Sequence, residues 1–209
     1  MTGDENLALG VSFGRLLKSQ IERQAMDSGV IFDESKIKEG FLVGLGDTEH
    51  QFSNEQLDLL LTEIDRKVRD GVLALASKEK AANIQSGKRR IAKLENEPDA
   101  IRLESGVVYI NLSPPTENRR PVSANDTVAI KYKMETAAGI VLDDTYDAEL
   151  GVEFVIDGLL FGIQQVIVNA EIGGRYLAII PPELAYGDES QLVDPGTYIV
   201  FEFDLLEIK

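Results

Sequence analysis

An uninterrupted helical pattern from about residue 54 to about residue 97 limits the fold of this chain more than any other feature of its sequence. Ser53 is the predicted N-cap, Gln56 follows it at the capping-box spacing, and Pro98 ends the pattern. A helix of this length extends about 60 Å, far more than a small helical core can cover. Beyond Ala82 the pattern is mostly polar. We therefore predict that the C-terminal end of this long linker helix is solvated and acts as a rigid spacer.

Two shorter helical patterns precede the long one. Residues Leu7 to Ala25 place apolar side chains at helical spacings, and Asp33 stands as the N-cap of a second helix. The apolar faces of such short helices, with Leu9, Phe13 and Leu17 on the first, cannot close a core alone. We expect these three residues to lie in the interface of an intertwined homodimer. An ordinary monomeric helical bundle is the alternative.

From Ser105 onward the pattern becomes that of β-strands. Five short runs are β-branched or alternating, with turn residues between them: GVVYINL, TVAIKYKME, VEFVI, RYLAII and TYIVFEFDLLEI. Residues 160–174 fit one short amphipathic helix closed by glycine, while Pro114-Pro115 and residues 118–121 mark loops. The chain is thus predicted to be α+β, with a helical dimerisation domain at 1–104 and a domain of antiparallel strands at 105–209.

Composition excludes several kinds of chemistry. With no cysteine and one histidine, His50, the chain has no route to thiol catalysis, disulfides or a multi-histidine metal site. Residues 105–209 hold 17 acidic and 6 basic residues, a net charge of −11, which repels nucleic acid and anionic membranes. No apolar run approaches the roughly 18 residues that span a bilayer. His50 is expected at the surface, and the carboxylates from Asp143 to Glu149 in a solvated loop rather than a cation site.

The stretch IIPPELAYGDES, residues 179–190, ends an apolar run with two prolines and then places a tyrosine on a tight turn. The order GIVLDDTY, VEFVIDGLLFGI, IGGRYLAIIPPELAYG and TYIVFEFDLLEIK resembles the FKBP-type peptidyl-prolyl cis–trans isomerases over about residues 105–209. The helical first half resembles the dimerising arm of the Mip/FkpA subgroup in its layout and in fragments such as LGVSFGRLL. The resemblance implies an antiparallel sheet wrapped on one short helix and an isomerase that uses no metal or other cofactor.

The same resemblance implies a location in the periplasm or cell envelope, with the cytoplasm as the second choice. Residues 1–10 lack the basic and apolar regions of a signal peptide. A cytosolic protein and a chain that begins after a removed signal both fit that pattern. The absence of cysteine fits an oxidising compartment.

The resemblance also implies the site residues. Tyr132, Asp143 and Tyr186 take the catalytic positions, and the Tyr186 hydroxyl is expected to bond a substrate carbonyl. Substrate contacts are implied at six further positions: Leu142, Val152, Leu159, Leu160, Ile163 and Phe201. The backbone N–H of Leu160 matches the family's donor to the bound peptide.

Three of these residues depart from the family pattern. Leu142, Val152 and Ile163 stand where the family usually has aromatic residues, and the loop before the last strand is shortened. Because an aromatic floor offers a large flat contact surface, we expect proline-ring binding to be weakened, and macrolide binding more so.

Two functions fit this pattern. One is an isomerase and folding chaperone that acts on proline-containing segments of unfolded proteins. Rotation about the X-Pro bond has a barrier of about 20 kcal/mol, and a dry pocket can lower it without a nucleophile. The other is a non-catalytic holdase or adaptor whose degenerate pocket only binds peptide. A purely structural dimer would require the pocket to be filled by its own side chains.

Overall fold

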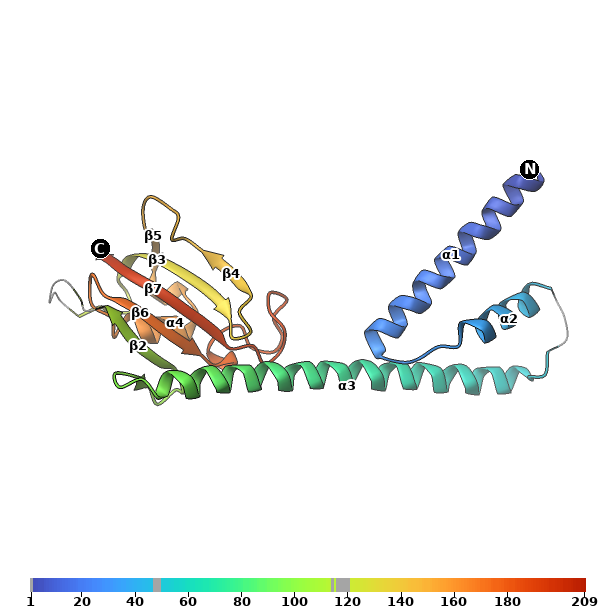
Figure 1. Cartoon of the computed structure of the whole chain (residues 1–209), viewed down its shortest axis with the longest axis horizontal. Coiled ribbons are helices and arrows are strands. Elements are labelled where there is room, and N and C mark those ends of the chain that lie inside the picture. Colours follow the sequence, from blue (N-terminus) through green and yellow to red (C-terminus); the bar gives the residue numbers. More distant parts are fainter. Residues whose placement is uncertain (1, 47–49, 114, 116–120) are drawn as a thin grey trace. The chain divides into compact units, whose positions relative to one another are not determined.

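The computed structural model describes residues 2–46, 50–113, 115 and 121–209. Its contacts divide the chain into two compact units, Met1–Lys78 and Glu79–Lys209 (Figure 1). The division falls inside the long helix, so the C-terminal turns of that helix belong to the second unit. This division lies N-terminal to the domain boundary predicted at residue 104. Among the described helices, none combines the length and the apolar character needed to cross a membrane.

Three helices make up the first unit: α1 (Gly3–Ser28), α2 (Glu34–Leu45) and the N-terminal part of α3 (Asn54–Glu95) (Figure 1). The end of α1 meets α3 at Gly71, where a Cβ would lie 2.1 Å from the carbonyl oxygen of Ser28. Large apolar side chains remain exposed on all three helices. One copy of this unit therefore leaves much of its apolar surface uncovered.

Both helix starts predicted from capping residues are confirmed. The Asp33 carboxylate accepts a hydrogen bond of 3.1 Å from the backbone N–H of Lys36 at the start of α2. Before α3, the Ser53 hydroxyl accepts from the Gln56 N–H at 3.2 Å, and the Gln56 side chain accepts from the Ser53 N–H at 2.8 Å. This reciprocal pair is the capping box expected from the spacing.

The C-terminal end of α3 is packed, so the prediction that it is solvated was wrong. Gly87, Ile91 and Leu94 are buried on this helix. Ile91 and Leu94 form one apolar cluster with four residues of the sheet: Val108, Ile110, Ile179 and Val200. A Cβ at Gly87 would lie 2.1 Å from the ring of Tyr198. The three helix residues form a stripe only one side chain wide, which the polar residues around them conceal in the sequence.

The second unit holds a seven-stranded antiparallel sheet in the order β1-β2-β6-β7-β3-β4, with β5 also paired to β3. The strands are β1 (Ile101–Arg102), β2 (Val108–Ser113), β3 (Thr127–Thr136), β4 (Val141–Asp144), β5 (Val152–Val155), β6 (Arg175–Ile180) and β7 (Ile199–Ile208). Two short 3-10 turns, η1 (Ile156–Gly158) and η2 (Pro182–Leu184), precede the segments that carry the site. The helix α4 (Phe161–Ile167) joins the core that covers one side of the sheet (Figure 1).

The predicted α+β architecture is confirmed, and each of the five predicted runs contains a strand. Two strands, β1 and β4, lie outside those runs, and α4 is shorter than the pattern at residues 160–174. α4 ends at Ile167, and the rest of the predicted run turns toward the sheet, where Gly173 adopts a φ of 80° and its N–H donates to the carbonyl of Leu205 at 2.7 Å. His50 is exposed as expected. Of the predicted loops, residues 114 and 116–120 lie outside the described residues.

Candidate functional site

A cavity of about 220 Å³ lies between α4 and strands β3, β5 and β7 of the second unit. Its lining comes from segments that are far apart in the sequence. The lining residues are Ile130, Tyr132, Met134, Phe154, Gly158, Leu159, Leu160, Ile163, Tyr186 and Phe201. Nearly all are apolar or aromatic, so the cavity suits a small apolar ring.

Aromatic rings build much of the wall. The ring of Tyr132 meets Phe154 edge-on, with centroids 5.8 Å apart and planes at 66°, and it lies 5.5 Å from Phe201. Ile163 and Phe201 are 4% and 2% exposed, so the innermost part is closed to solvent. α4 approaches the sheet closely at Gly162, where a Cβ would lie 2.2 Å from Ile180. That close approach places Ile163 in the cavity.

Two phenols and one carboxylate supply the polar groups of the site. The Tyr132 hydroxyl donates to the carboxylate of Asp143, whose other oxygen accepts from the N–H of Asp144 at 2.9 Å. Among the described residues, the hydrogen-bond partner of the Tyr186 hydroxyl is the sulfur of Met134, at 3.7 Å. A thioether is a weak hydrogen-bond acceptor, so the Tyr186 hydroxyl can leave it and donate to a stronger acceptor. The Tyr132 hydroxyl is already engaged by a charged partner.

Both phenols remain protonated at neutral pH. Burial raises the pKa of Tyr132, and the hydrogen bond to Asp143 raises it further. Burial also raises the pKa of Tyr186, and the negative charge of Asp143 acts in the same direction. A neutral phenol that keeps its proton is a hydrogen-bond donor. The Tyr186 hydroxyl is therefore a donor across the physiological range.

The turn after β6 explains the position of Tyr186. Pro181 ends the strand, and η2 follows it at once. Gly187 then adopts a φ of 72° and its N–H donates to the carbonyl of Pro182 at 2.8 Å. Only a residue without a Cβ takes that φ at low cost. The proline pair thus stops the strand, and the closed turn holds Tyr186 against the cavity.

The chain between η1 and α4 brings the backbone to the cavity. Leu159 and Leu160 both line it. The Leu159 N–H donates to the carbonyl of Ile156 at 3.0 Å. Within the described residues, the Leu160 N–H has no hydrogen-bond acceptor. A donor without a partner at the edge of an apolar cavity can bind a ligand carbonyl.

Two of the predicted substrate contacts lie elsewhere. Val152 is half-buried on β5 but does not line the cavity; Phe154, two residues further along the same face, does. Leu142 packs against the core and lines a different hollow. The other predicted contacts, Leu159, Leu160, Ile163 and Phe201, converge on the cavity with Tyr132 and Tyr186.

Sequence reasoning missed four lining residues: Ile130, Met134, Phe154 and Gly158. Strand alternation was the available signal for three of them. Residues 130 and 134 share the face of Tyr132 on β3, and residue 154 shares the face of Val152 on β5. Because Phe154 adds an aromatic ring, the loss of aromatic wall is smaller than the sequence implied.

The comparisons with known proteins agree with this geometry. Residues 118–206 match the family model described as FKBP-type peptidyl-prolyl cis-trans isomerase. The FKBP-type peptidyl-prolyl cis-trans isomerase FkpA of Escherichia coli (strain K12) is 27% identical over 203 residues, which cover 97% of this chain and 74% of that protein. FkpA of Aeromonas hydrophila is 26% identical over 203 residues, with the same coverage.

Solved structures give the same result. The crystal structure of FkpA from Escherichia coli matches with a TM-score of 0.79 at 26% identity, covering 99% of this chain and 95% of that chain. A peptidyl-prolyl cis-trans isomerase from Pseudomonas syringae pv. tomato matches with a TM-score of 0.53 at 25% identity, covering 62% of this chain and 95% of that one.

Proposed function

We propose that this chain, an FKBP-type peptidyl-prolyl cis–trans isomerase of the FkpA kind, acts as an isomerase and chaperone on proline-containing segments of unfolded proteins. Tyr186 carries this proposal. Its hydroxyl is a protonated donor that faces an apolar cavity, and its partner within the described part of the chain is a thioether. Such a donor exchanges a weak acceptor for a substrate carbonyl when peptide binds.

The cavity walls favour rotation about the X-Pro bond. The planar amide is stabilised by charge-separated resonance, which is lost as the bond twists, and this loss produces the barrier of about 20 kcal/mol. An apolar cavity solvates the charge-separated planar amide less well than water does. The twisted amide has less charge separation, so it loses less solvation free energy when it moves from water into the cavity. Binding therefore favours the transition state over the ground state. No nucleophile, metal or cofactor takes part in this scheme.

We assign the Tyr186 hydroxyl and the Leu160 N–H to peptide binding, and the Tyr132–Asp143 pair to holding the cavity wall. The Tyr186 hydroxyl and the Leu160 N–H donate to substrate carbonyls on either side of the bound ring. Tyr132 and Asp143 bond to each other, so they hold the cavity wall and keep the negative charge beside Tyr186. Burial and, after it, the charge of Asp143 raise the pKa of Tyr186, while the ring of Tyr132 forms the contact surface.

The test is the cis-to-trans rate of a short peptide with a bulky apolar residue before proline. We expect a rate proportional to protein concentration. Tyr186→Phe lowers it by about tenfold, the loss of one donor to the reacting amide. The matched control is Tyr146→Phe, because the buried Tyr146 hydroxyl has no partner among the described residues and lies outside the cavity. Equal rates for both variants would remove Tyr186 from the mechanism.

A binding-only adaptor is the second candidate, since the aliphatic Ile163 occupies the innermost wall of a cavity of only about 220 Å³. In that case the folded protein would bind the peptide and leave its isomerisation at the uncatalysed rate.

We further propose that the first unit forms a homodimer through α1. Leu9 is 47% and Phe13 is 56% exposed, and Leu17 lies beside them on the same helix. Two cavities on one dimer raise the effective concentration of peptide sites along one unfolded chain. Sedimentation at micromolar concentration tests this proposal, and a strictly monomeric mass would refute it.

We also propose that the protein is located in the cell envelope. The absence of cysteine and the likeness to FkpA support it. Fractionation of the native cells, followed by detection of the protein in the periplasmic or the cytoplasmic fraction, decides between the two compartments.

A further inference from the structure

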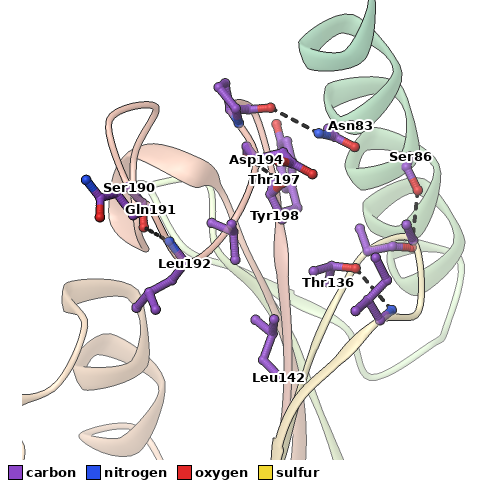
Figure 2. Close-up of a pocket in the computed structure, with 15 residues that line it drawn as sticks. Asn83, Ser86, Thr136, Leu142, Ser190, Gln191, Leu192, Asp194, Thr197 and Tyr198 are labelled. Carbon is purple, nitrogen blue, oxygen red and sulfur yellow. Dashed lines mark hydrogen bonds between the residues drawn. The ribbon is translucent and has the colours of Figure 1, made fainter. Parts of the chain in front are cut away.

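A second hollow, of about 380 Å³, lies entirely within the second unit (Figure 2). Asn83 and Ser86 of α3 line one side, and residues within 136–142 and 190–198 line the rest. We call it the α3 groove. In Figure 2 the helix borders it on one side, and the segment with Ser190, Gln191 and Leu192 borders it on the other.

The α3 groove has an apolar floor and exposed apolar rims. Leu142 and Val193 belong to the packed core of the unit and form the floor. Ile140 and Leu192 are 63% and 74% exposed at the rims. Large apolar side chains gathered around a hollow mark an interaction surface, whereas a single exposed one does not.

Hydrogen bonds from α3 hold both walls of the groove. The Asn83 side-chain amide donates to the carbonyl of Pro195 at 3.1 Å, and the Ser86 hydroxyl donates to the carbonyl of Ala137 at 3.1 Å (Figure 2). Lys80 pairs with Asp188, which also accepts from the N–H of Gly196 at 2.9 Å. The walls are therefore fixed before any ligand binds, which lowers the entropic cost of binding.

The one charge among the residues that line the groove is negative, while Arg90, outside the lining, donates to the carbonyl of Ala137 and also lies near Glu135. Asp194 is the one charged residue among the fifteen described lining residues, and it is exposed. Its carboxylate makes no hydrogen bond or ion pair within the described residues. Glu189, also exposed, lies next to the segment. A ligand with a basic side chain finds an uncommitted partner here, and one with an acidic side chain is repelled.

The α3 groove adjoins the isomerase cavity through β4. Leu142, in the groove, and Asp143, which accepts from the cavity residue Tyr132, are consecutive in that strand. Val193 of the groove packs in the same apolar cluster as Phe201 of the cavity. The two hollows thus share one strand and one apolar cluster.

We propose that the α3 groove binds the client segment that flanks the proline, and that it selects extended segments with apolar side chains and a nearby lysine or arginine. The proposal rests on the isomerase function assigned to the neighbouring cavity. It makes the linker helix a wall of the substrate site as well as a connection between units. Short peptides occupy the cavity alone, and longer client segments occupy both hollows.

The experiment uses the full-length protein and three labelled or chromogenic peptides. The first is a short X-Pro peptide. The second is a proline-free extended peptide that alternates leucine with serine and carries one lysine, and the third replaces that lysine by glutamate. Affinity for the proline-free peptides is measured by fluorescence anisotropy, and isomerisation of the short peptide by its cis-to-trans rate.

We expect the lysine peptide to bind more tightly than the glutamate peptide. Leu192→Ser and Ile140→Ser should each weaken binding of the lysine peptide by about tenfold, because each removes an apolar rim contact without adding a charge. Asp194→Asn should reduce the preference for lysine by about two- to threefold, and salt should reduce it likewise. The matched control is Val155→Ser, since Val155 is 51% exposed and lies outside both hollows.

The short peptide separates this proposal from the proposed function. Unchanged isomerisation of the short peptide in all four variants, with loss of proline-free binding only in the groove variants, supports the α3 groove. Equal binding by the groove variants and Val155→Ser refutes it, even if the short peptide is isomerised normally. If the wild-type protein fails to isomerise the short peptide, the isomerase function is refuted, and with it the role of the groove in catalysis.

Discussion

Gly87→Ala tests whether the C-terminal end of α3 is packed. The substitution raises the helix propensity, which stabilises the protein, and it crowds Tyr198, which destabilises it. On an exposed helix face, replacing glycine by alanine stabilises by about 1 kcal/mol. Here the added Cβ would lie 2.1 Å from two ring carbons of Tyr198 and 2.7 Å from its Cβ, so backbone as well as side chain must shift. Overpacking of this kind costs about 1–3 kcal/mol. We expect a net loss of about 1–2 kcal/mol.

The sequence supplies a selective probe for this measurement. All six tyrosines lie in residues 105–209, and the chain has no tryptophan. Tyrosine fluorescence during urea unfolding therefore reports on the second unit alone, and the free energy of unfolding follows from the midpoint and slope. Ala82→Gly, at an exposed position of the same helix, measures the propensity effect by itself.

The double variant completes the test. In a Tyr198→Ala background the two shortest contacts are gone, so most of the cost of Gly87→Ala should disappear. An increase in stability from Gly87→Ala in the wild-type background, equal to the loss from Ala82→Gly, would contradict the packing described here. The end of α3 would then be solvated, and the α3 groove would lose one of its walls.

Three further predictions concern the cavity and the first unit. Phe154→Ala should lower kcat/KM for a short X-Pro peptide by at least tenfold and destabilise the second unit by about 2 kcal/mol, whereas Val152→Ala should leave kcat/KM unchanged because Val152 does not line the cavity. Phe13→Asp should convert a dimer to a monomer in sedimentation, with the tyrosine unfolding transition unchanged. The raised pKa of Tyr132 and Tyr186 favours their neutral forms, so the stability they contribute is complete below about pH 10 and lost as pH rises through the raised values. Activity that declines between pH 7 and pH 9 would contradict this assignment.

Local chemistry was readable from the sequence. Asp33 and Ser53 mark helix starts because their side chains accept from backbone N–H groups three residues away. The strand runs were equally visible, since alternation requires only a few neighbouring residues. The turn that holds Tyr186 was readable because a proline pair and Gly187 define it within one short stretch, whereas the role of its hydroxyl came from the family resemblance.

Contacts between distant segments were not readable in this way. The packed stripe on α3 contains one glycine and two apolar residues, and only the presence of Tyr198 shows why Gly87 belongs to it. The bond from Asn83 to Pro195 joins residues 112 positions apart. Phe154 was missed because the resemblance implies Val152, on the same face of β5, and does not give which residue of that face lines the cavity. Each error concerned a partner that the local sequence does not contain.

The most direct test of the central claim is exchange spectroscopy on a short X-Pro peptide mixed with the protein, with wild-type and Tyr186→Phe compared. The peptide's cis and trans resonances report binding by their shifts and catalysis by their exchange rate in the same sample. We predict exchange that accelerates in proportion to protein concentration and slows by about tenfold in Tyr186→Phe while the shifts persist. Shifts that show binding, together with exchange at the uncatalysed rate, would contradict the account and identify the cavity as a peptide-binding site only.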